Sequence, residues 1–255
     1  RSQERAAHAW ASGWFDWETF DVAVPQRRGD PAIVHSDEGV RAGTTTESLA
    51  NLRPVFDRTG AVTAGNASTL NDGASAVLVA EESFAKEQGW DIIAFIEDYC
   101  TSGVEPARVM SAPIPAIKML LERNNLSVLD VDVYEHNEAF ASASCAVAQE
   151  VGIPDDRFNL HGGAVSLGHP LGASGTRCLI TLLGVMRRLE ASSGIVTLCL
   201  GGGNAVANRP NAPNAGRRLL RACRRSRPLS FATGGDRCLQ ADQAHLPDCG
   251  ENPTS

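Results

Sequence analysis

The sequence predicts an α/β fold, because apolar strand-like segments alternate with helical ones and glycine-rich loops lie between them. The alternation is regular from Ile92 to Ala207, without a long interruption. Folds of this kind place their binding sites at the loops that follow the strands. The glycine-rich segments are therefore the first places to look for functional residues.

Residues 1–91 are expected to hold fewer regular elements, separated by a polar, turn-rich stretch. Alanine-rich composition favours a helix at the start, and a proline closes a short helix further on. An apolar run bounded by Gly, Asn and Ser favours a buried strand. The predicted elements are a helix over 2–10, a strand over 20–25, a short helix ending at Pro54, a buried strand over 76–80 and a helix over 81–89.

From residue 92 the predicted strands and helices alternate. Proline at the first helical position and basic residues in the last turn are signals for helix ends. The expected elements are a strand at 92–100, a helix at 113–125, a strand running into a turn at 131–140, a helix at 141–152, a glycine-rich loop at 162–175, a helix at 176–190 and a strand at 194–200.

The composition is that of an ordinary globular protein, with 43% hydrophobic and 21% charged residues among 255. No apolar run is long enough to predict a transmembrane segment. The seven cysteines form no CxxC pair and no regular spacing with histidine, so we expect reduced thiols and no metal site.

Residues 208–255 hold eight arginines against four acidic residues and are rich in Pro, Gly and Asn. We expect this atypical basic tail to be disordered, and not to bind nucleic acid, because Phe231 is its only aromatic residue.

The most informative segment is GGAVSLGHPLGASG, at 162–175. Glycines let the backbone approach a ligand closely, and the proline after His169 holds the histidine backbone in an extended form. This arrangement predicts that His169 points into a site. The alternative is a tight structural turn in which the histidine is only packed and hydrogen-bonded.

Cys199 lies at the end of the predicted strand 194–200, directly before three glycines at 201–203. A strand end that opens into a glycine turn exposes a thiol beside free N–H groups, which can lower the thiol pKa or form an oxyanion hole. Cys199 is therefore a candidate nucleophile or base. The alternative is a small core residue that precedes a turn.

The segment NEAF, at 137–140, lies where a strand gives way to a helix of small residues. Asn137 can orient a water or a carbonyl, and the carboxylate of Glu138 beside it can hold a histidine. A helix cap is the alternative. Three site-like segments that each follow a strand, in order between residues 137 and 203, favour a common site.

These segments resemble the thiolase family, in which NEAF, GGAxxxGHPxGASGxR and CxGGGxxxA occur in this order. VTAGNASTLNDGASA, at 62–76, is similar to a further signature of that family. The resemblance runs from Ser2 to Ala207 and implies a thiolase-like α/β fold with a complete C-terminal half. It divides the chain into the remainder of a coenzyme A-binding loop domain (1–61), the last elements of the N-terminal half (62–91), the C-terminal domain (92–207) and the basic tail (208–255).

The resemblance implies an acyltransferase of fatty acid metabolism, which condenses acetyl-CoA or cleaves 3-ketoacyl-CoA with coenzyme A. In that reading Cys199 is the base for the α-proton. His169 and Asn137 hold the thioester oxygen of the attacking unit, and the N–H of Gly201 contributes to a second oxyanion hole. Ser68 is similar to the residue that binds the pantetheine arm and Arg41 to one near the nucleotide end, with ordinary loop roles as the alternative for both.

The resemblance also implies a nucleophilic cysteine before the loop domain, and we expect this chain to be the C-terminal part of such an enzyme, without that segment. Cys100, Cys145 and Cys178 are expected to be structural. Acyl-CoA substrates are the expected partners, with no cofactor beyond coenzyme A itself, and the full-length protein is expected to be a cytoplasmic homo-oligomer, with organellar targeting left open. The alternatives are a catalytically dead chain that keeps coenzyme A binding or a subunit interface, and a truncated product with no stable fold.

Overall fold

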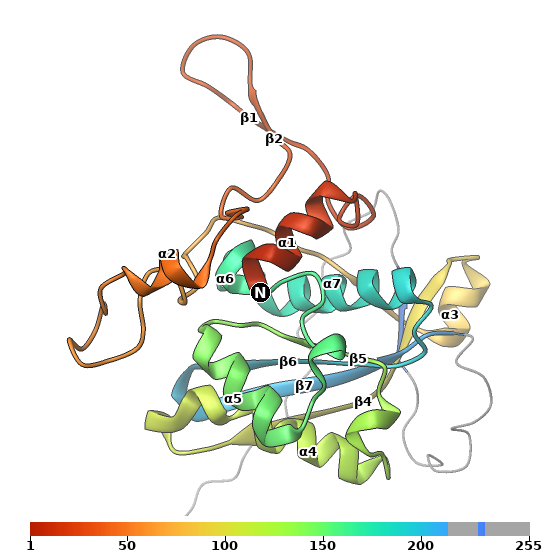
Figure 1. Ribbon diagram of the computed structural model, residues 1–255. Coiled ribbons are helices and arrows are strands. Elements are labelled where there is room, and N and C mark those ends of the chain that lie inside the picture. Colours follow the sequence, from red (N-terminus) through yellow and green to blue (C-terminus); the bar gives the residue numbers. More distant parts are fainter. Residues whose placement is uncertain (214–228, 233–255) are drawn as a thin grey trace, which may run out of the picture.

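A six-stranded mixed sheet organises the chain in the computed structural model, which describes residues 1–213 and the backbone of residues 229–232 (Figure 1). The strand order is β3-β8-β4-β7-β6-β5, with β5 and β6 parallel and the other neighbours antiparallel. The strands of this sheet are β3 (Leu78–Glu81), β4 (Ile92–Gly103), β5 (Val133–His136), β6 (Gly194–Leu200), β7 (Asn204–Asn211) and β8 (Leu229–Ala232). The α/β class predicted from the sequence is confirmed.

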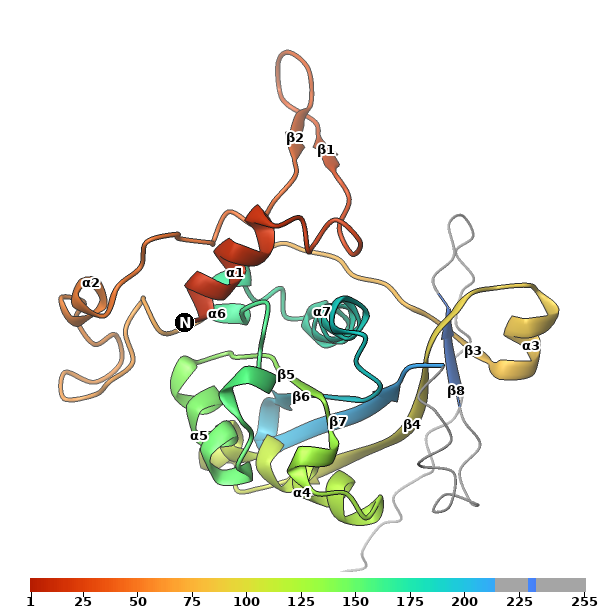
Figure 2. The same cartoon turned by 45° about the vertical axis from the view of Figure 1, so that its right-hand side comes forward.

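Helices cover both faces of the sheet (Figure 2). The α-helices are α1 (Ser2–Ala11), α2 (Thr46–Ala50), α3 (Glu82–Glu87), α4 (Pro113–Arg123), α5 (Ala141–Val151), α6 (Ala164–Leu167) and α7 (Ser174–Leu189). Short 3-10 turns are η1 (Pro106–Ser111), η2 (Val128–Asp130), η3 (Asp155–Arg157) and η4 (Gly201–Gly203). In Figure 2 α7 lies over one face, and α4 and α5 lie over the other.

The period-two alternation of the central strands divides the core between these two layers. Tyr134 and Ile195 pack among the side chains of α4 and α5, whereas Val133 and Val196 pack against α7. Both faces of β6 are therefore covered, which explains its nearly continuous hydrophobic run, whereas β5 ends with the buried polar residues Glu135 and His136.

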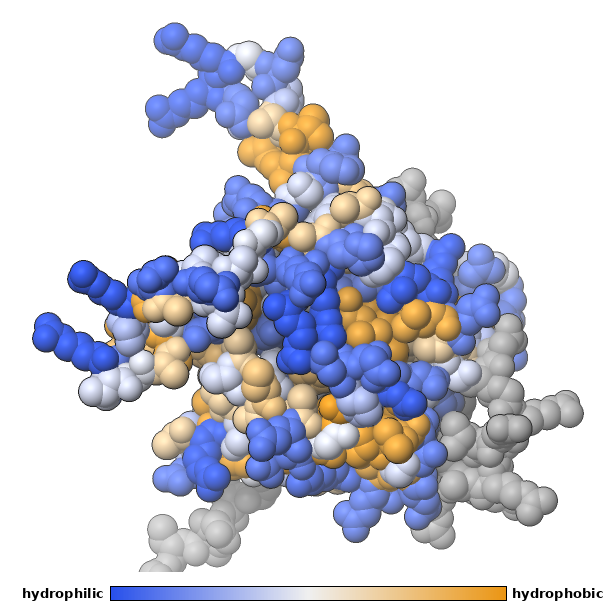
Figure 3. All heavy atoms as spheres, viewed as in Figure 1, coloured by the Kyte–Doolittle hydropathy of each residue, from blue (hydrophilic) through white to orange (hydrophobic). Residues whose placement is uncertain are grey.

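The first 75 residues lie along the α7 side and contain little regular structure. Helix α1 packs on α6 through a small cluster that includes Ala6, Ala9 and Leu167. Beyond it the hairpin of β1 (Val22–Val24) and β2 (Ala32–Val34) projects away from the sheet (Figures 1 and 2). Its stem carries exposed apolar side chains, visible as an orange band in Figure 3.

Several details differ from the sequence-based expectations. The predicted strand 194–200 is β6, and a further strand that was not predicted, β7, runs four residues into the tail, to Asn211, because it pairs with β4. The strand near 76–80 is half exposed rather than buried, since Val79 keeps 47% of its surface accessible. Helix α2 ends at Ala50, before Pro54, and the glycine-rich loop contains a turn of helix, α6. Of the tail expected to be disordered, 229–232 forms a strand, and residues 214–228 and 233–255 lie outside the described residues.

Candidate active site

Asn137 lies directly after β5, where the chain leaves the sheet. Its N–H donates to the carbonyl of Thr197 on the parallel strand β6 at 3.1 Å, which extends the pairing by one residue. Alternation sends Val133, Glu135 and Asn137 to the side covered by α7. Only 1% of Asn137 is exposed, so its amide must find hydrogen-bond partners on that side.

His169 lies on the same side, in the loop between α6 and α7. Its backbone N–H donates to the carbonyl of Thr69 at 3.0 Å and to Asn71 Oδ1 at 3.1 Å. Gly168 has φ of +87°, and a side chain there would collide with Asn71. The glycine before the histidine is therefore required by the backbone angle and by this close approach.

The side chains of Asn137 and His169 meet, with Asn137 Nδ2 at 3.3 Å from His169 Nε2. On the other side of the ring, His169 Nδ1 is 2.5 Å from Ser174 Oγ, and that hydroxyl donates to the carbonyl of Pro170 at 3.0 Å. Because the hydroxyl hydrogen of Ser174 is donated to Pro170, Ser174 Oγ must accept from His169, and we assign the ring proton to Nδ1. This leaves Nε2 to accept from Asn137. Burial and the neighbouring charge of Arg177 lower the pKa of His169, which favours this neutral form.

The segment that contains Ser68 runs beside the Asn137–His169 pair. The N–H of Ser68 donates to the carbonyl of Ala139 at 2.9 Å, and Leu70 forms a bridge with His169. Ser68 is half buried. The structure thus brings together three of the segments singled out in the sequence: 62–76, NEAF and the GHP loop.

Arg41 lies apart from this cluster. It is exposed, and its backbone N–H donates to Gln3 Oε1 at 2.7 Å. The contacts described for Arg41 do not join it to Ser68, Asn137 or His169.

Cys199 is half buried near the end of β6, and the structure does not join its thiol to the pair. Its Sγ lies 3.8 Å from Met110 Sδ in η1. Side chains alternate along β6, so Cys199 lies on the same face of the sheet as Ile195, whose side chain packs with α4. Asn137 lies on the other face, toward α7. Burial raises the pKa of the Cys199 thiol, with a smaller lowering from a backbone hydrogen bond. This corrects the expectation that the glycine turn lowers it.

Gly201 begins the glycine turn η4 and is exposed, with open space where a side chain would extend. Two residues later the turn packs closely. Gly203 has φ of +92°, and a side chain there would collide with the carbonyl of Val104. The turn is therefore fixed at Gly203 and open at Gly201.

Glu138 has a different role from the one expected. Its carboxylate accepts a hydrogen bond from Ser2 Oγ at 2.5 Å, so it ties α1 to the site instead of holding His169. Ser2 Oγ is also 2.9 Å from Ser166 Oγ and accepts from the N–H of Gly163 at 3.2 Å. Burial raises the pKa of Glu138.

Sequence reasoning missed the buried polar residues behind Asn137. Cys178, expected to be structural, places its Sγ 3.5 Å from Asn137 Oδ1. Arg177 donates to Cys178 Sγ at 2.9 Å and to Glu135 Oε1 at 3.1 Å. The available signal was the arginine of GASGTR, a charged residue near the start of an otherwise apolar helix, where burial requires a partner.

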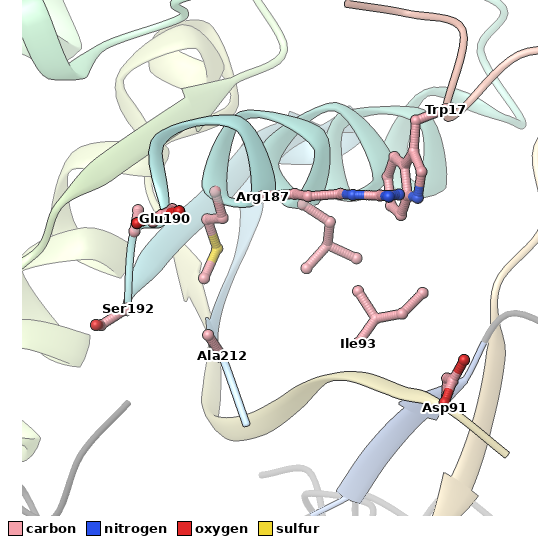
Figure 4. A pocket seen from close by; sticks show the side chains of 10 residues that line it. Trp17, Asp91, Ile93, Arg187, Glu190, Ser192 and Ala212 are labelled. Carbon is pink, nitrogen blue, oxygen red and sulfur yellow. The ribbon is translucent and has the colours of Figure 1, made fainter. Parts of the chain in front are cut away.

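A hollow among the described residues lies elsewhere. It borders the C-terminal half of α7, where Trp17, Ile93, Met186 and Arg187 line it (Figure 4). The Arg187 guanidinium lies over the Trp17 ring, 5.3 Å from its centre. The hollow shares no residue with the Asn137–His169 cluster, so the candidate site rests on the hydrogen-bonded pair and the loops around it.

Among residues 1–213 and 229–232, no group of three or more His, Cys, Asp or Glu side chains could hold a metal ion. None of the helices in this part of the chain is long and apolar enough to cross a membrane.

Family models match most of the chain. The model described as "Thiolase, N-terminal domain" matches residues 1–83, and the one described as "Thiolase, C-terminal domain" matches residues 90–209. A "Probable acetyl-CoA acyltransferase" of Staphylococcus epidermidis is 48% identical over 81% of this chain and 52% of that relative. An "Acetyl-CoA acetyltransferase" of Cupriavidus necator is 47% identical over the same shares.

Solved structures give the same result. The acetyl-CoA acetyltransferase of Bacillus anthracis aligns with a TM-score of 0.74 and 37% identity, over 83% of this chain and 54% of that one. Human mitochondrial 3-ketoacyl-CoA thiolase aligns with a TM-score of 0.76 and 35% identity, over 83% and 53%. The chain spans about half the length of the curated relatives it matches. From its two matching domains, its relatives and its fold, the chain belongs to the thiolase family.

Proposed function

We propose that this chain carries the carbonyl-binding and proton-abstracting part of a thiolase-type acyltransferase that acts on acetyl-CoA or 3-ketoacyl-CoA. The observation that carries the proposal is the pair of the buried Asn137 and the half-buried His169, 3.3 Å apart and framed by three thiolase-like segments. Substrates named for relatives, acetyl-CoA and 3-ketoacyl-CoA, suggest the substrate class. The proposed reaction requires no cofactor beyond the coenzyme A of the substrates.

The pair suits a thioester oxygen that gains negative charge. Asn137 Nδ2 has two hydrogens, and only one is needed for His169 Nε2. The second is free to donate to the oxygen of an enolate. His169, whose Nε2 faces Asn137, is the proposed second group at that oxygen. A preorganised donor of this kind is typically the largest contribution to such a reaction.

Cys199 is the proposed base. It lies two residues after Thr197, whose carbonyl accepts from the N–H of Asn137, and two residues before Gly201, where the turn η4 begins. As a thiolate it would take the α-proton of the acetyl group, and the electron pair of that C–H bond would become the enolate. The raised thiol pKa makes the thiolate a stronger base but a less populated one.

The remaining proposed contacts are with the acyl-CoA. The N–H of Gly201 would donate to the oxygen of the second acyl group, because the turn leaves open space at that residue. Ser68, which lies beside the pair, would bind the pantetheine arm. Arg41, which is exposed, would lie near the nucleotide.

Exchange of the α-hydrogens of acetyl-CoA for deuterium in D2O tests this half of the reaction alone. We expect the chain to catalyse the exchange and Cys199→Ala to slow it by about 100-fold or more, the usual effect of losing a general base. Asn137→Ala should also slow the exchange. Cys145→Ala is the control, because Cys145 is exposed on α5.

Mass spectrometry of the acetyl group gives the rate, and calorimetry with coenzyme A gives binding. Binding without exchange, or exchange by Cys199→Ala at the rate of the unchanged chain, would refute the proposed role of this site. Loss of binding in Ser68→Ala with exchange preserved at saturating acetyl-CoA would support the pantetheine contact.

A further inference from the structure

We propose that Cys178 is a positioning residue that fixes which way the Asn137 amide faces, and that Arg177 and Glu135 hold Cys178 in that role. This inference rests on the proposed function of Asn137. It assigns a role in the site to a cysteine that the sequence places only in the apolar part of a helix.

Cys178 lies behind Asn137, on the first turns of α7. Its side chain is fully buried, and its Sγ is 3.5 Å from Asn137 Oδ1, within reach of an S–H···O hydrogen bond. The opposite atom of the same amide, Nδ2, faces His169 Nε2. The amide is therefore held at both ends, with a thiol on one side and an imidazole on the other.

The directions of these hydrogen bonds agree along the whole chain of groups. Ser174 donates to Pro170 and accepts from His169 Nδ1, so His169 Nε2 has a lone pair and needs an N–H facing it. Asn137 Nδ2, 3.3 Å away, supplies that N–H. A flipped amide would place Oδ1 against this lone pair and would present an N–H, not an acceptor, to the thiol.

Arg177 makes the thiol a donor toward Asn137. The guanidinium is buried, with Nη1 bound to Glu135 Oε1 at 3.1 Å and to Thr181 Oγ1 at 3.3 Å, and Nη2 donates to Cys178 Sγ at 2.9 Å. A sulfur that accepts from Arg177 keeps its own hydrogen for another partner, and Asn137 Oδ1 is the oxygen in reach. Burial raises the pKa of the Cys178 thiol to about 12, so the S–H is present throughout the neutral range.

The consequence for the site is the orientation of the free N–H of Asn137. With Oδ1 held by Cys178, both hydrogens of Nδ2 lie on the His169 side, where the proposed thioester oxygen would be. Without that hydrogen bond the amide could rotate and present an oxygen to the enolate, which would repel it. Loss of this hydrogen bond would therefore lower the rate of acetyl-CoA exchange and leave coenzyme A binding unchanged.

Cys178→Val and Cys178→Ser test the inference. Valine is close in size to cysteine but has no donor, whereas serine keeps one. The matched control is Cys100→Val, because Cys100 is also buried and also donates its S–H to an oxygen, the carbonyl of Ala116 at 3.2 Å. The readouts are acetyl-CoA exchange, coenzyme A affinity and the 15N shifts of the His169 ring, assigned with His169→Gln.

We expect Cys178→Val to slow exchange about fivefold, the effect of losing one ordinary hydrogen bond, with coenzyme A affinity unchanged. Cys178→Ser should restore the rate to within about twofold. The 15N shifts should show an Nδ1–H ring in the unchanged chain and a mixture with the Nε2–H form in Cys178→Val. Cys100→Val should leave the rate and the ring unchanged.

The outcomes separate this inference from the proposed function. Unchanged exchange and an unchanged His169 ring in Cys178→Val, while Cys199→Ala abolishes exchange, would overturn the inference and leave the function standing. A changed ring in Cys178→Val, in a chain that shows no exchange, would support the inference and refute the function. If Cys178→Val does not fold, failure of Cys178→Ser to retain the Nδ1–H ring would overturn the inference.

Discussion

Replacing Gly168 by alanine should destabilise the fold and disturb His169 together. Gly168 has φ of +87° and ψ of 169°, a region that essentially only glycine occupies, and the strain there is about 1–3 kcal/mol for other residues. The new methyl group would also collide with Asn71, which accepts from the N–H of His169 and from Thr69 Oγ1. Loss of one such hydrogen bond adds about 1 kcal/mol. The expected loss of unfolding free energy is therefore about 2–4 kcal/mol.

Urea unfolding followed by circular dichroism measures this loss, and the matched control is Gly172→Ala. Gly172 lies in the same loop, has no positive φ, and has open space around the position of a new methyl group. We expect that variant to lie within about 0.5 kcal/mol of the unchanged chain. Equal stability of the two variants would refute the reasoning, because only Gly168 has the unusual backbone angle and the close neighbour.

Two further predictions concern buried polar groups. Burial lowers the pKa of His136 to about 4, whereas the ordinary pKa in the unfolded chain is 6.5. As the pH falls from 6.5 toward 4, the unfolded chain takes up a proton at His136 and the folded chain does not. The unfolding free energy should therefore decrease over this range. NMR titration of the His136 ring checks the pKa, and protonation near pH 6.5 in the folded state would contradict it. Ser2→Ala removes a donor to Glu138 and an acceptor for the N–H of Gly163. It should lower the unfolding free energy, measured by urea unfolding at pH 7, by about 1–3 kcal/mol. A decrease below about 0.5 kcal/mol would contradict a stabilising role for this link.

The parts of the site that sequence reasoning anticipated are those in which local backbone constraints and chemistry coincide. His169 and Asn137 could be singled out because a glycine, a proline or a strand end beside each of them limits the backbone. Ser68 could be placed with them only through the family resemblance, since its link to Ala139 joins segments about 70 residues apart in the chain.

The parts that were missed depend on tertiary packing. The proposed role of Cys178 depends on how α7 is rotated about its axis where it packs on β5. That rotation places Cys178, on the buried face of the helix, next to Asn137. The pKa of Cys199 moves upward because burial outweighs the backbone hydrogen bond, a balance that the residue types do not reveal. Strand β7 continues to Asn211 because β4 is long enough to pair with it, whatever its own composition favours.

The link between Ser2 and Glu138 also bears on how the chain folds. It joins residues 136 positions apart, and the neighbouring contact between Ser2 and Ser166 spans 164 positions. Contacts of such sequence separation form slowly, since the entropy of closing so long a loop opposes them. During synthesis α1 is made long before β5 and α6, the elements it contacts. It can therefore pack in its final position only after both have been made. The loop that carries Asn137 therefore acquires its final support only when most of the chain has been made.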